Sequence, residues 1–275
     1  MNIAQMTRNC ETKLQKIGAG HEAHELMQHV LQCSWTELIQ NRQVAMSEQS
    51  AKALEALIEQ RLAGCPLAYI LGEWTFFGHS FFVEEGVLIP REETEELVRL
   101  ALQKMGQKRD GDVLDLCCGS GCIAVTLANE NADWTVYAAD ISEKALDMAV
   151  RNANVYGREI TFYRSDLLKD ISRCFDIIVC NPPYIRLTDR ETLQREVRDH
   201  EPSLALFGGE DGLAFYRRLN EEAACHLHPG GWLMMEIGYD QREAVMRIFQ
   251  AGGWKNRMCV SDFAGQDRVI LAERP

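Results

Sequence analysis

From Gly111 to its last residue, this 275-residue chain alternates short apolar segments with longer segments of helical spacing. Continuous apolar segments such as DVLDLC and FDIIVC are typical of strands that are buried on both faces of a parallel sheet. The segments between them, such as GCIAVTLANEN, have the length and spacing of helices. This alternation predicts an α/β fold with a mostly parallel sheet. The last two strand-like segments, RMCVSDF and RVILAER, lie close together in the chain and predict an antiparallel edge strand.

The part of the chain before this pattern has a different character. Residues 1–70 carry apolar residues at helical spacing, with Ser47 suited to begin a helix and Gly64 suited to end it. Residues 71–90 are aromatic and rich in glycine, which indicates a β-hairpin linker. The sequence therefore predicts a small helical domain over 1–70, a hairpin linker over 71–90 and an α/β domain over 91–275. The segment Arg186 to Gly212 has no clear periodicity and is predicted to be a long irregular loop.

Charge and composition narrow the classes of partner. The chain has a net charge of −12 and lacks a strong basic cluster, which argues against a large surface for nucleic-acid phosphates. No apolar run approaches the length that spans a membrane, and the N-terminal residues contain no secretory apolar segment. With ten cysteines in this context, we expect free thiols in a reducing compartment, the cytoplasm.

The first candidate site is the turn in DVLDLCCGSGCIA, where a strand leads into a helix. Gly119 and Gly121 lie in this turn, and glycine lets the backbone approach a ligand closely. In open α/β sheets, ligands bind at the carboxyl edge, where such turns lie. The alternative is a tight turn that requires glycine only for its own geometry.

Two carboxylates follow the next two strands. Asp140 ends WTVYAAD, where an acidic residue can accept hydrogen bonds from both hydroxyls of a ribose. Asp166 follows ITFYRS, where a carboxylate can meet an exocyclic adenine amine. Each also has a structural alternative, a helix cap for Asp140 and a loop aspartate for Asp166, although Ser142 can take the capping role. Because the chain lacks a Walker lysine and a third turn glycine, the pattern favours a nucleoside without a pyrophosphate, such as S-adenosylmethionine.

The segment CNPPYI follows the predicted strand FDIIV directly. Two prolines end the strand because each fixes φ and lacks an N–H group. They leave the Asn181 side-chain amide and a proline carbonyl with no evident backbone partner, so a ligand is expected to use them. The alternative is a turn that only terminates the strand.

These motifs together resemble a known class of enzymes. DLCCGSG, Asp140, Asp166 and NPPY are similar to the Rossmann-type, class I S-adenosylmethionine-dependent methyltransferases that act on amide or exocyclic amino nitrogens. A closer resemblance is to the peptide chain release factor N(5)-glutamine methyltransferases, the PrmC/HemK family. It is carried by RLAGCPLAYILGEWTFFGHSFFVEEGVLIPREETEELV, HEPSLALFGGEDGLAFYRRL and GGWLMMEIGYDQ. It covers essentially the whole chain and is least specific in the helical N-terminus.

The resemblance implies roles for individual residues. Asn181, through its side-chain oxygen, and Pro182, through its backbone carbonyl, would receive the substrate glutamine amide. Pro183 would stiffen the loop, and Tyr184 would pack on the amide and exclude water. The residues implied to contact S-adenosylmethionine, and the product S-adenosylhomocysteine, are Cys117, Cys118, Gly119, Ser120, Gly121, Asp140, Asp166, Leu167 and Asn181.

The chain departs from the family's common pattern at the glycine turn. The family commonly has glycine and threonine where this chain has Cys117 and Cys118, and we expect Cys117 to be tolerated if its φ is negative. The resemblance places Arg91 and Glu93 beside the cofactor pocket. For Glu236, at the end of a late strand, a structural role and a place in the pocket wall both stay open.

Four functions are considered for a chain with these motifs. The first is methylation of the GGQ glutamine of release factors by a monomeric enzyme whose helical domain and hairpin dock the protein substrate. The second is methylation of a glutamine on a ribosomal protein, which would use the same catalytic residues. The third is methylation of a nucleic-acid amino group, which would require a basic, salt-sensitive face. The fourth is a non-catalytic S-adenosylmethionine-binding protein, against which the intact NPPY argues.

A metal site is a weaker interpretation of the N-terminal histidines. His21, His24, His29 and Cys33 lie roughly along one side of a predicted helix, but no second ligand cluster accompanies them. We expect helix residues without a metal.

Overall fold

The computed structural model describes all residues, 1–275, and divides into two compact units. The helical unit comprises Met1–Gly72 together with Gln194–His200. The second unit comprises Glu73–Leu193 and Glu201–Pro275. The sequence ranges assigned Gln194–His200 to the α/β domain, whereas in the structure this segment groups with the N-terminal helices.

The helical unit is built from short and medium-length helices. Its longest helix begins at the predicted cap Ser47, whose side chain accepts a hydrogen bond from the Ser50 N–H, and ends at the predicted Gly64, which is left-handed. The stretch before it, predicted as helical, is interrupted where left-handed Gly18 ends a short 3₁₀ turn. The helices are α1 (Ile3–Leu14), α2 (Ala23–Leu31), α3 (Trp35–Gln40), α4 (Glu48–Ala63), α5 (Leu67–Leu71) and α9 (Arg195–His200).

A buried ion pair lies within the apolar core of the helical unit. Arg61 of α4 is 8% exposed, and its Nε and Nη2 donate to the two oxygens of Glu22 over 2.6 and 2.9 Å. The same Nη2 lies 2.9 Å from Glu196 Oε2 in α9. One guanidinium therefore binds a carboxylate bidentately and also connects α9 to the N-terminal helices.

The second unit opens with the predicted β-hairpin. Strands β1 (Glu73–Phe76) and β2 (His79–Phe82) pair antiparallel, joined by Phe77 and Gly78, both with positive φ. Two positive φ angles at the centre of a two-residue loop match the right-handed twist of the strands. Phe76 and Phe81 are buried in the same apolar cluster as residues of α7 and α8, so the hairpin is packed on the α/β layers.

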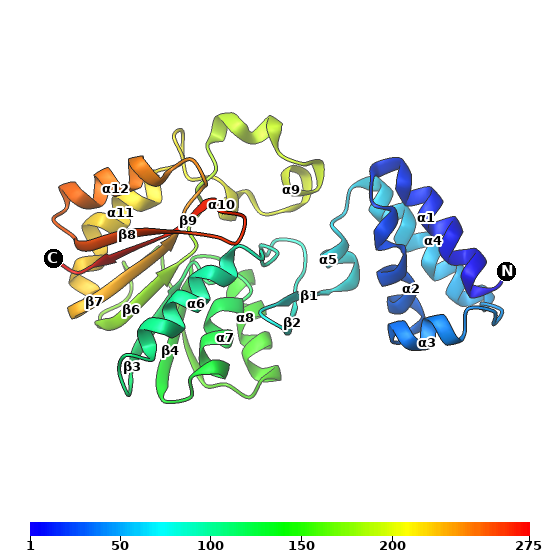
Figure 1. The fold of residues 1–275 in the computed structure, drawn as a ribbon, viewed down its shortest axis with the longest axis horizontal. Helices are drawn as coiled ribbons and strands as arrows, with labels where there is room; N and C mark the ends of the chain where they lie inside the picture. The colour runs from blue at the N-terminus through cyan, green and yellow to red at the C-terminus, as the bar shows by residue number, and fades with distance from the viewer. The chain divides into compact units, whose positions relative to one another are not determined.

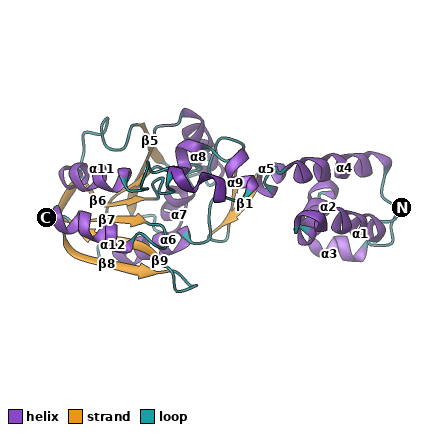
Figure 2. Cartoon of the chain, turned by 90° about the horizontal axis from the view of Figure 1, so that it is seen from above, coloured by secondary structure: helices purple, strands orange, loops and turns teal.

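The centre of the second unit is a seven-stranded sheet, shown in orange in Figure 2. Its order is β5-β4-β3-β6-β7-β9-β8. The first five strands in this order are parallel to one another, and β9 is antiparallel to both β7 and β8. This confirms the predicted mostly parallel sheet with an antiparallel edge. The strands are β3 (Gly111–Leu116), β4 (Trp134–Asp140), β5 (Ile160–Arg164), β6 (Phe175–Cys180), β7 (Leu227–Glu236), β8 (Lys255–Ser261) and β9 (Asp267–Glu273).

Helices cover both faces of the sheet (Figure 1). Successive strand residues point to opposite faces, so Val113 packs against one helical layer and Leu114 against the other. The first layer contains α6 (Thr94–Met105), α7 (Cys122–Glu130) and α8 (Glu143–Val155), and the second contains α11 (Ala214–Glu222) and α12 (Arg242–Ala251). No helix of the chain combines the length and apolar character needed to span a membrane.

The topology determines where a ligand can bind. β3 has β4 on one side and β6 on the other, so the strand order reverses direction there. Loops that leave the carboxyl ends of two such neighbouring strands diverge to opposite faces and leave a crevice between them. The turn after β3 and the NPPY loop after β6 both lie at this edge.

The segment Arg186 to Gly212 is not the irregular loop that the sequence predicted. It contains the 3₁₀ helix η3 (Leu187–Thr192), then α9, then α10 (Ser203–Leu206). These helices are four to six residues long, which is too short for helical periodicity to be recognised in the sequence.

Candidate active site

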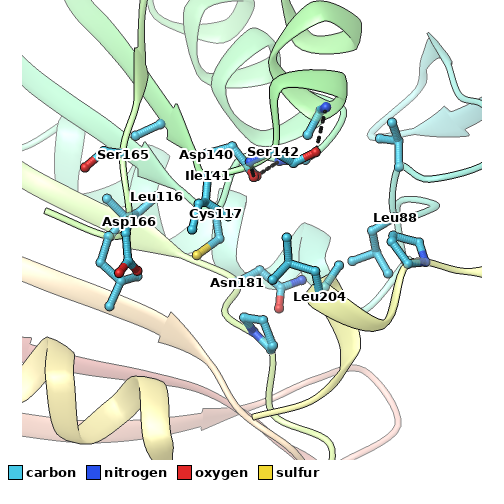
Figure 3. A pocket seen from close by; sticks show the side chains of 18 of the residues that line it. Leu88, Leu116, Cys117, Asp140, Ile141, Ser142, Ser165, Asp166, Asn181 and Leu204 are labelled. Carbon is cyan, nitrogen blue, oxygen red and sulfur yellow. Dashed lines mark hydrogen bonds between the residues drawn. The ribbon is translucent and has the colours of Figure 1, made fainter. Parts of the chain in front are cut away.

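A cavity of about 180 Å³ opens at the carboxyl ends of the parallel strands. Figure 3 shows the Asp166 carboxylate toward one end, Asn181 and Leu204 toward the other, and the Cys117 sulfur between them. The predicted site residues that line this cavity are Cys117, Gly119, Asp140, Asp166, Leu167, Asn181 and Pro183. Residues from four successive strand ends are therefore brought together around one space.

The two turn glycines are required for different reasons, one for ligand space and the other for helix packing. Gly119 has φ +54° and lines the cavity, and a Cβ built on it would meet no atom within 4 Å. A side chain there would be strained and would occupy the space that a ligand needs. Gly121 has φ +77°, and its Cβ would lie 2.8 Å from Ala149 Cβ in α8. This second glycine permits close packing between the start of α7 and α8.

The condition under which we expect Cys117 to be tolerated, a negative φ, is not met. Its φ is +60°, a left-handed conformation that costs a non-glycine residue roughly 1–2 kcal/mol. The chain must turn sharply here, because Cys118 N donates to Ala139 O over 3.0 Å and holds the loop against the end of β4. Cys118 and Ser120 are buried, and neither they nor Gly121 line the cavity.

Asp140 is held by backbone groups on both of its oxygens. Oδ2 accepts a hydrogen bond from Gly119 N and Oδ1 accepts one from Ser142 N, each over 2.9 Å. Ser142 caps α8, as predicted, by accepting from Ala145 N. Burial raises the pKa of Asp140, and the backbone N–H groups oppose that rise. Because a carboxylate offers about four acceptor positions, Asp140 can still receive two hydroxyl groups from a ligand.

Asp166 is ion-paired rather than free. Its Oδ1 accepts a hydrogen bond from Arg218 Nη1 over 2.7 Å, and Arg218 is a residue of α11. The carboxylate is therefore held in place by a helix of the second layer, and its Oδ2 stays available to a ligand. Leu167 follows with φ +52°, which turns the chain back after β5.

The NPPY loop presents acceptors with no partner in the chain, among them the Asn181 side-chain oxygen and the Pro182 carbonyl. The Asn181 side chain donates from Nδ2 to Thr94 Oγ1 over 3.1 Å. No residue donates to Asn181 Oδ1 or to the Pro182 carbonyl. Asn181 lines the cavity, so its acceptor is available to a ligand there.

The backbone of this loop is held by close contacts. Gln241 Nε2 donates to Tyr184 O over 2.9 Å. A Cβ on Gly212 would lie 2.3 Å from Tyr184 O, and one on Gly208 would lie 2.5 Å from Pro183 O. Only glycine permits such approach, so the GGEDG segment acts as a backing for the loop.

Side chains of the loop point in different directions. Pro182 and Tyr184 do not line the cavity, and the Tyr184 hydroxyl donates instead to Glu236 Oε1 over 3.2 Å. Burial raises the pKa of Tyr184, and the neighbouring Glu236 carboxylate adds to that rise. The implied packing of Tyr184 on a substrate amide stays a prediction.

The remaining candidates are not part of the cavity wall. Arg91 forms an ion pair with the buried Glu201, and neither Arg91, Glu93 nor Glu236 lines the cavity. No group of three or more His, Cys, Asp or Glu residues is placed to hold a metal ion.

Three residues that support the site were missed by sequence reasoning: Thr94, Arg218 and Gln241. They bond to Asn181, Asp166 and Tyr184 across 87, 52 and 57 residues of sequence. No local motif marks them, because their role depends only on which elements the fold brings together.

Asp115 is a buried carboxylate in β3, directly before the glycine turn. Its Oδ2 accepts from Ala124 N over 3.0 Å, whereas its buried Oδ1 has no hydrogen-bond partner. Burial raises the pKa of Asp115 well above its usual value, and the nearby Asp140 contributes in the same direction. The ionised form is therefore disfavoured in the folded state.

We expect Asp115→Asn to gain stability relative to the wild type as the pH rises. A raised pKa means that the folded chain binds the proton more tightly than the unfolded chain, so wild-type stability falls from about pH 4 upward until the raised pKa is passed. Asparagine has no such titration. Urea unfolding across that pH range measures the difference. Exposed Asp133→Asn is the control, and a difference for Asp115→Asn that stays constant with pH would contradict the expectation.

Comparisons with known proteins agree with this architecture. Residues 85–203 match the family model of the methyltransferase small domain, and residues 5–72 match that of the PrmC N-terminal domain. Among solved structures, a methyltransferase from Pyrococcus furiosus aligns with a TM-score of 0.55 and 18% identity over 80% of this chain and 97% of its own. A ribosomal protein L11 methylase from Lactobacillus delbrueckii subsp. bulgaricus aligns with a TM-score of 0.52 and 21% identity over 70% and 83%. These structural similarities show the class I methyltransferase fold.

Sequence similarity is closer and extends over the whole chain. The release factor glutamine methyltransferase of Bacillus cereus is 39% identical over 282 aligned positions, covering 99% of both chains. The enzyme of the same name from Streptococcus pneumoniae is 40% identical over 278 positions, again covering 99% of both. With matching domain models, a matching fold and full-length identity at this level, the chain belongs to the family of release factor glutamine methyltransferases.

Proposed function

We propose that this protein transfers a methyl group from S-adenosylmethionine to the side-chain amide nitrogen of the glutamine in the GGQ motif of peptide chain release factors. The observation that carries the proposal is the pair of free acceptors, Asn181 Oδ1 and the Pro182 carbonyl, in a loop beside the cavity. A primary amide has two N–H bonds to donate, and each of these two oxygens can accept one of them.

The residues of the cavity fit S-adenosylmethionine. Asp140 supplies acceptors for ribose hydroxyls, and Asp166 supplies one for an amine. At Gly119 a side chain would fill the ligand space. When bound, the cofactor would supply an electrophilic methyl group on a positively charged sulfur.

The chain's own residues address the weakness of the nucleophile. An amide nitrogen is a poor nucleophile because its lone pair is delocalised into the carbonyl. Asn181 and Pro182, each accepting one N–H, would orient the nitrogen and stabilise the positive charge that develops on it during transfer. The nitrogen then loses a proton to water, so no strong base is required before transfer. The backing of the loop by Gly208, Gly212 and Gln241 keeps both acceptors in place before the substrate arrives.

The parts of the chain would divide substrate docking and chemistry between them. The helical domain over 1–70 and the hairpin linker over 71–90 would dock the release factor, and the domain over 91–275 would perform the chemistry. The enzyme would act as a monomer in the cytoplasm, where release factors work. It would bind neither nucleic acid nor a membrane directly.

The test is transfer of a labelled methyl group to a purified release factor, compared with a release factor whose GGQ glutamine is changed to alanine. Mass spectrometry locates the label. One methyl group on that glutamine, absent in the variant, is the expected result. Label that enters a ribosomal protein or RNA instead would keep the fold and the methyl-transfer chemistry and refute the proposed substrate.

Asp140→Ala is expected to weaken S-adenosylmethionine binding by about 10- to 100-fold, because hydrogen bonds to a charged group contribute roughly 1.5–3 kcal/mol. Isothermal titration calorimetry measures the dissociation constant. Asp133→Ala, which removes an exposed carboxylate directly before β4, serves as the matched control and should bind normally. An unchanged affinity in Asp140→Ala would exclude the ribose-binding role.

A further inference from the structure

A buried carboxylate contacts the NPPY loop directly, through Tyr184, and indirectly, through Thr94. Glu236, at the end of β7, is 1% exposed and does not line the cavity. Its Oε2 accepts a hydrogen bond from Thr94 Oγ1 over 2.6 Å, and its Oε1 accepts one from the Tyr184 hydroxyl over 3.2 Å. Thr94, the first residue of α6, also contacts Asn181. One carboxylate is thus connected to both ends of the NPPY motif.

The direction of these hydrogen bonds follows from their chemistry. An ionised carboxylate can only accept, so the single hydroxyl hydrogen of Thr94 is given to Glu236. Thr94 Oγ1 then has only lone pairs left for Asn181 at 3.1 Å, and Asn181 must present its Nδ2 to it. The amide oxygen of Asn181 is therefore directed away from Thr94. Without Glu236, the Thr94 hydroxyl can either donate to the Asn181 amide oxygen or accept from its nitrogen, so both orientations of the amide are compatible with it.

We propose that Glu236 and Thr94 are positioning residues, which orient the Asn181 amide so that its oxygen faces the substrate nitrogen, and that Glu236 also fixes the Tyr184 hydroxyl. This inference rests on the function proposed above. A reversed Asn181 would present N–H groups to a substrate amide that also carries N–H groups, and the pair would repel. The orientation of one side chain thus decides whether the loop can bind a glutamine amide.

The hydrogen-bond direction derived above requires an ionised Glu236, and the surroundings of this side chain make that charge costly to the fold. Burial raises its pKa, and Glu93 repels it. Arg268 of β9 attracts it, but that guanidinium also bonds to Asp262 over 3.1 Å. Tyr216 donates to the Glu236 main-chain carbonyl rather than to its carboxylate. An apolar residue would suit such a site better for stability, whereas only an acceptor-only group imposes the direction derived above.

The experiment compares Thr94→Val, Thr94→Ser and Glu236→Gln in the full-length protein. Valine keeps the shape of threonine and removes the hydroxyl, and serine restores the hydroxyl. Glutamine at position 236 can donate to Thr94, which permits the reversed chain of bonds. The matched control is Thr126→Val in α7, a fully buried threonine whose hydroxyl bonds only to Cys122 O.

We expect Thr94→Val to lower kcat by about 10- to 100-fold, as displacement of a positioned group does, and Glu236→Gln to lower it by about tenfold or more. KM for the release factor and the Kd of S-adenosylmethionine should stay within about threefold. Thr94→Ser should recover kcat to within about threefold of wild type, and Thr126→Val should leave kcat unchanged.

A second readout does not depend on turnover. In protein with ¹⁵N-labelled asparagine, the side-chain NH₂ signals of Asn181 are identified by their loss in Asn181→Ala. They should shift in Thr94→Val and Glu236→Gln and stay in place in Thr94→Ser. Wild-type kcat in Thr94→Val or Glu236→Gln, or unmoved Asn181 signals in both, would overturn the inference. A thermal destabilisation of Thr94→Val with equal losses in cofactor affinity and turnover would also overturn it, since that is the signature of a purely structural residue.

These results separate the two proposals. If the wild type fails to methylate a release factor, the proposed function is wrong, and the NMR signals alone decide whether Thr94 and Glu236 orient Asn181. If the wild type is active, the ratios between the variants decide it.

Discussion

Asn181→Ala is expected to reduce methyl transfer to the release factor by on the order of a thousandfold, the upper range for removing one group that stabilises transition-state charge. The side-chain oxygen of Asn181 has no partner in the chain and lies at the cavity, so alanine removes an acceptor that only a ligand can use. The Kd of S-adenosylmethionine should change by less than about tenfold, which corresponds to about 1.4 kcal/mol. Single-turnover kinetics and calorimetry measure the two effects separately.

The control for this variant is Asn129→Ala. Asn129 lies at the end of α7 and bonds to Arg158 Nε through its side-chain oxygen, so its removal should affect packing but not turnover. Near-normal turnover in Asn181→Ala would refute the role of its amide in catalysis. A loss of cofactor affinity as large as the loss of turnover would assign Asn181 to cofactor binding instead.

Arg61→Ala is expected to lower the free energy of unfolding of the helical unit by about 3–5 kcal/mol, because it leaves the Glu22 carboxylate buried without its partner. Three guanidinium bonds to Glu22 and Glu196 are lost together. Chemical unfolding of the full chain, with proteolysis and mass spectrometry to locate the weakened region, measures the effect. Early cleavage should fall within residues 1–72 and at α9.

Two variants distinguish the buried charge from the connection to α9. Glu196→Ala removes only the more exposed partner, whose side chain is 30% exposed, so the expected loss is about 1 kcal/mol or less. Replacing both buried partners, Arg61→Met with Glu22→Leu, should restore most of the stability, because an apolar pair carries no desolvation cost. A destabilisation by Glu196→Ala as large as that by Arg61→Ala would show that attachment of α9, not the burial of charge, dominates.

The predicted elements that the structure confirms are those with strong local signals. The parallel strands were recognised by continuous apolar segments, the helix α4 by Ser47 and Gly64, and the hairpin by its glycines. The expectation that failed concerns the short helices after Arg186, whereas the φ of Cys117 was left open by the sequence. The φ of Cys117 depends on how β3 leads into a loop held by Ala139, and the helices after Arg186 are too short to show a period.

The site residues that the sequence identified are also those with a local motif. The motifs after β3, β4, β5 and β6 each carry their chemistry in a few consecutive residues, and the resemblance of those residues to methyltransferases indicated the family that the full-length comparisons show. Their individual roles stay predictions. Placing them around one cavity requires only that the strands be parallel and adjacent, which the strand–helix alternation already predicted.

The sequence by itself therefore determined the fold class, the strand ends that carry polar groups and the presence of asparagine and proline acceptors in NPPY. Only the tertiary structure decided which groups hold them. Thr94 meets Asn181 across 87 residues and Glu236 across 142, and Arg61 meets Glu22 across 39. A hydrogen bond requires atoms within about 3 Å and a defined direction. Local sequence patterns describe how a segment folds, whereas distances between segments arise only when the sheet and its helices pack into one core.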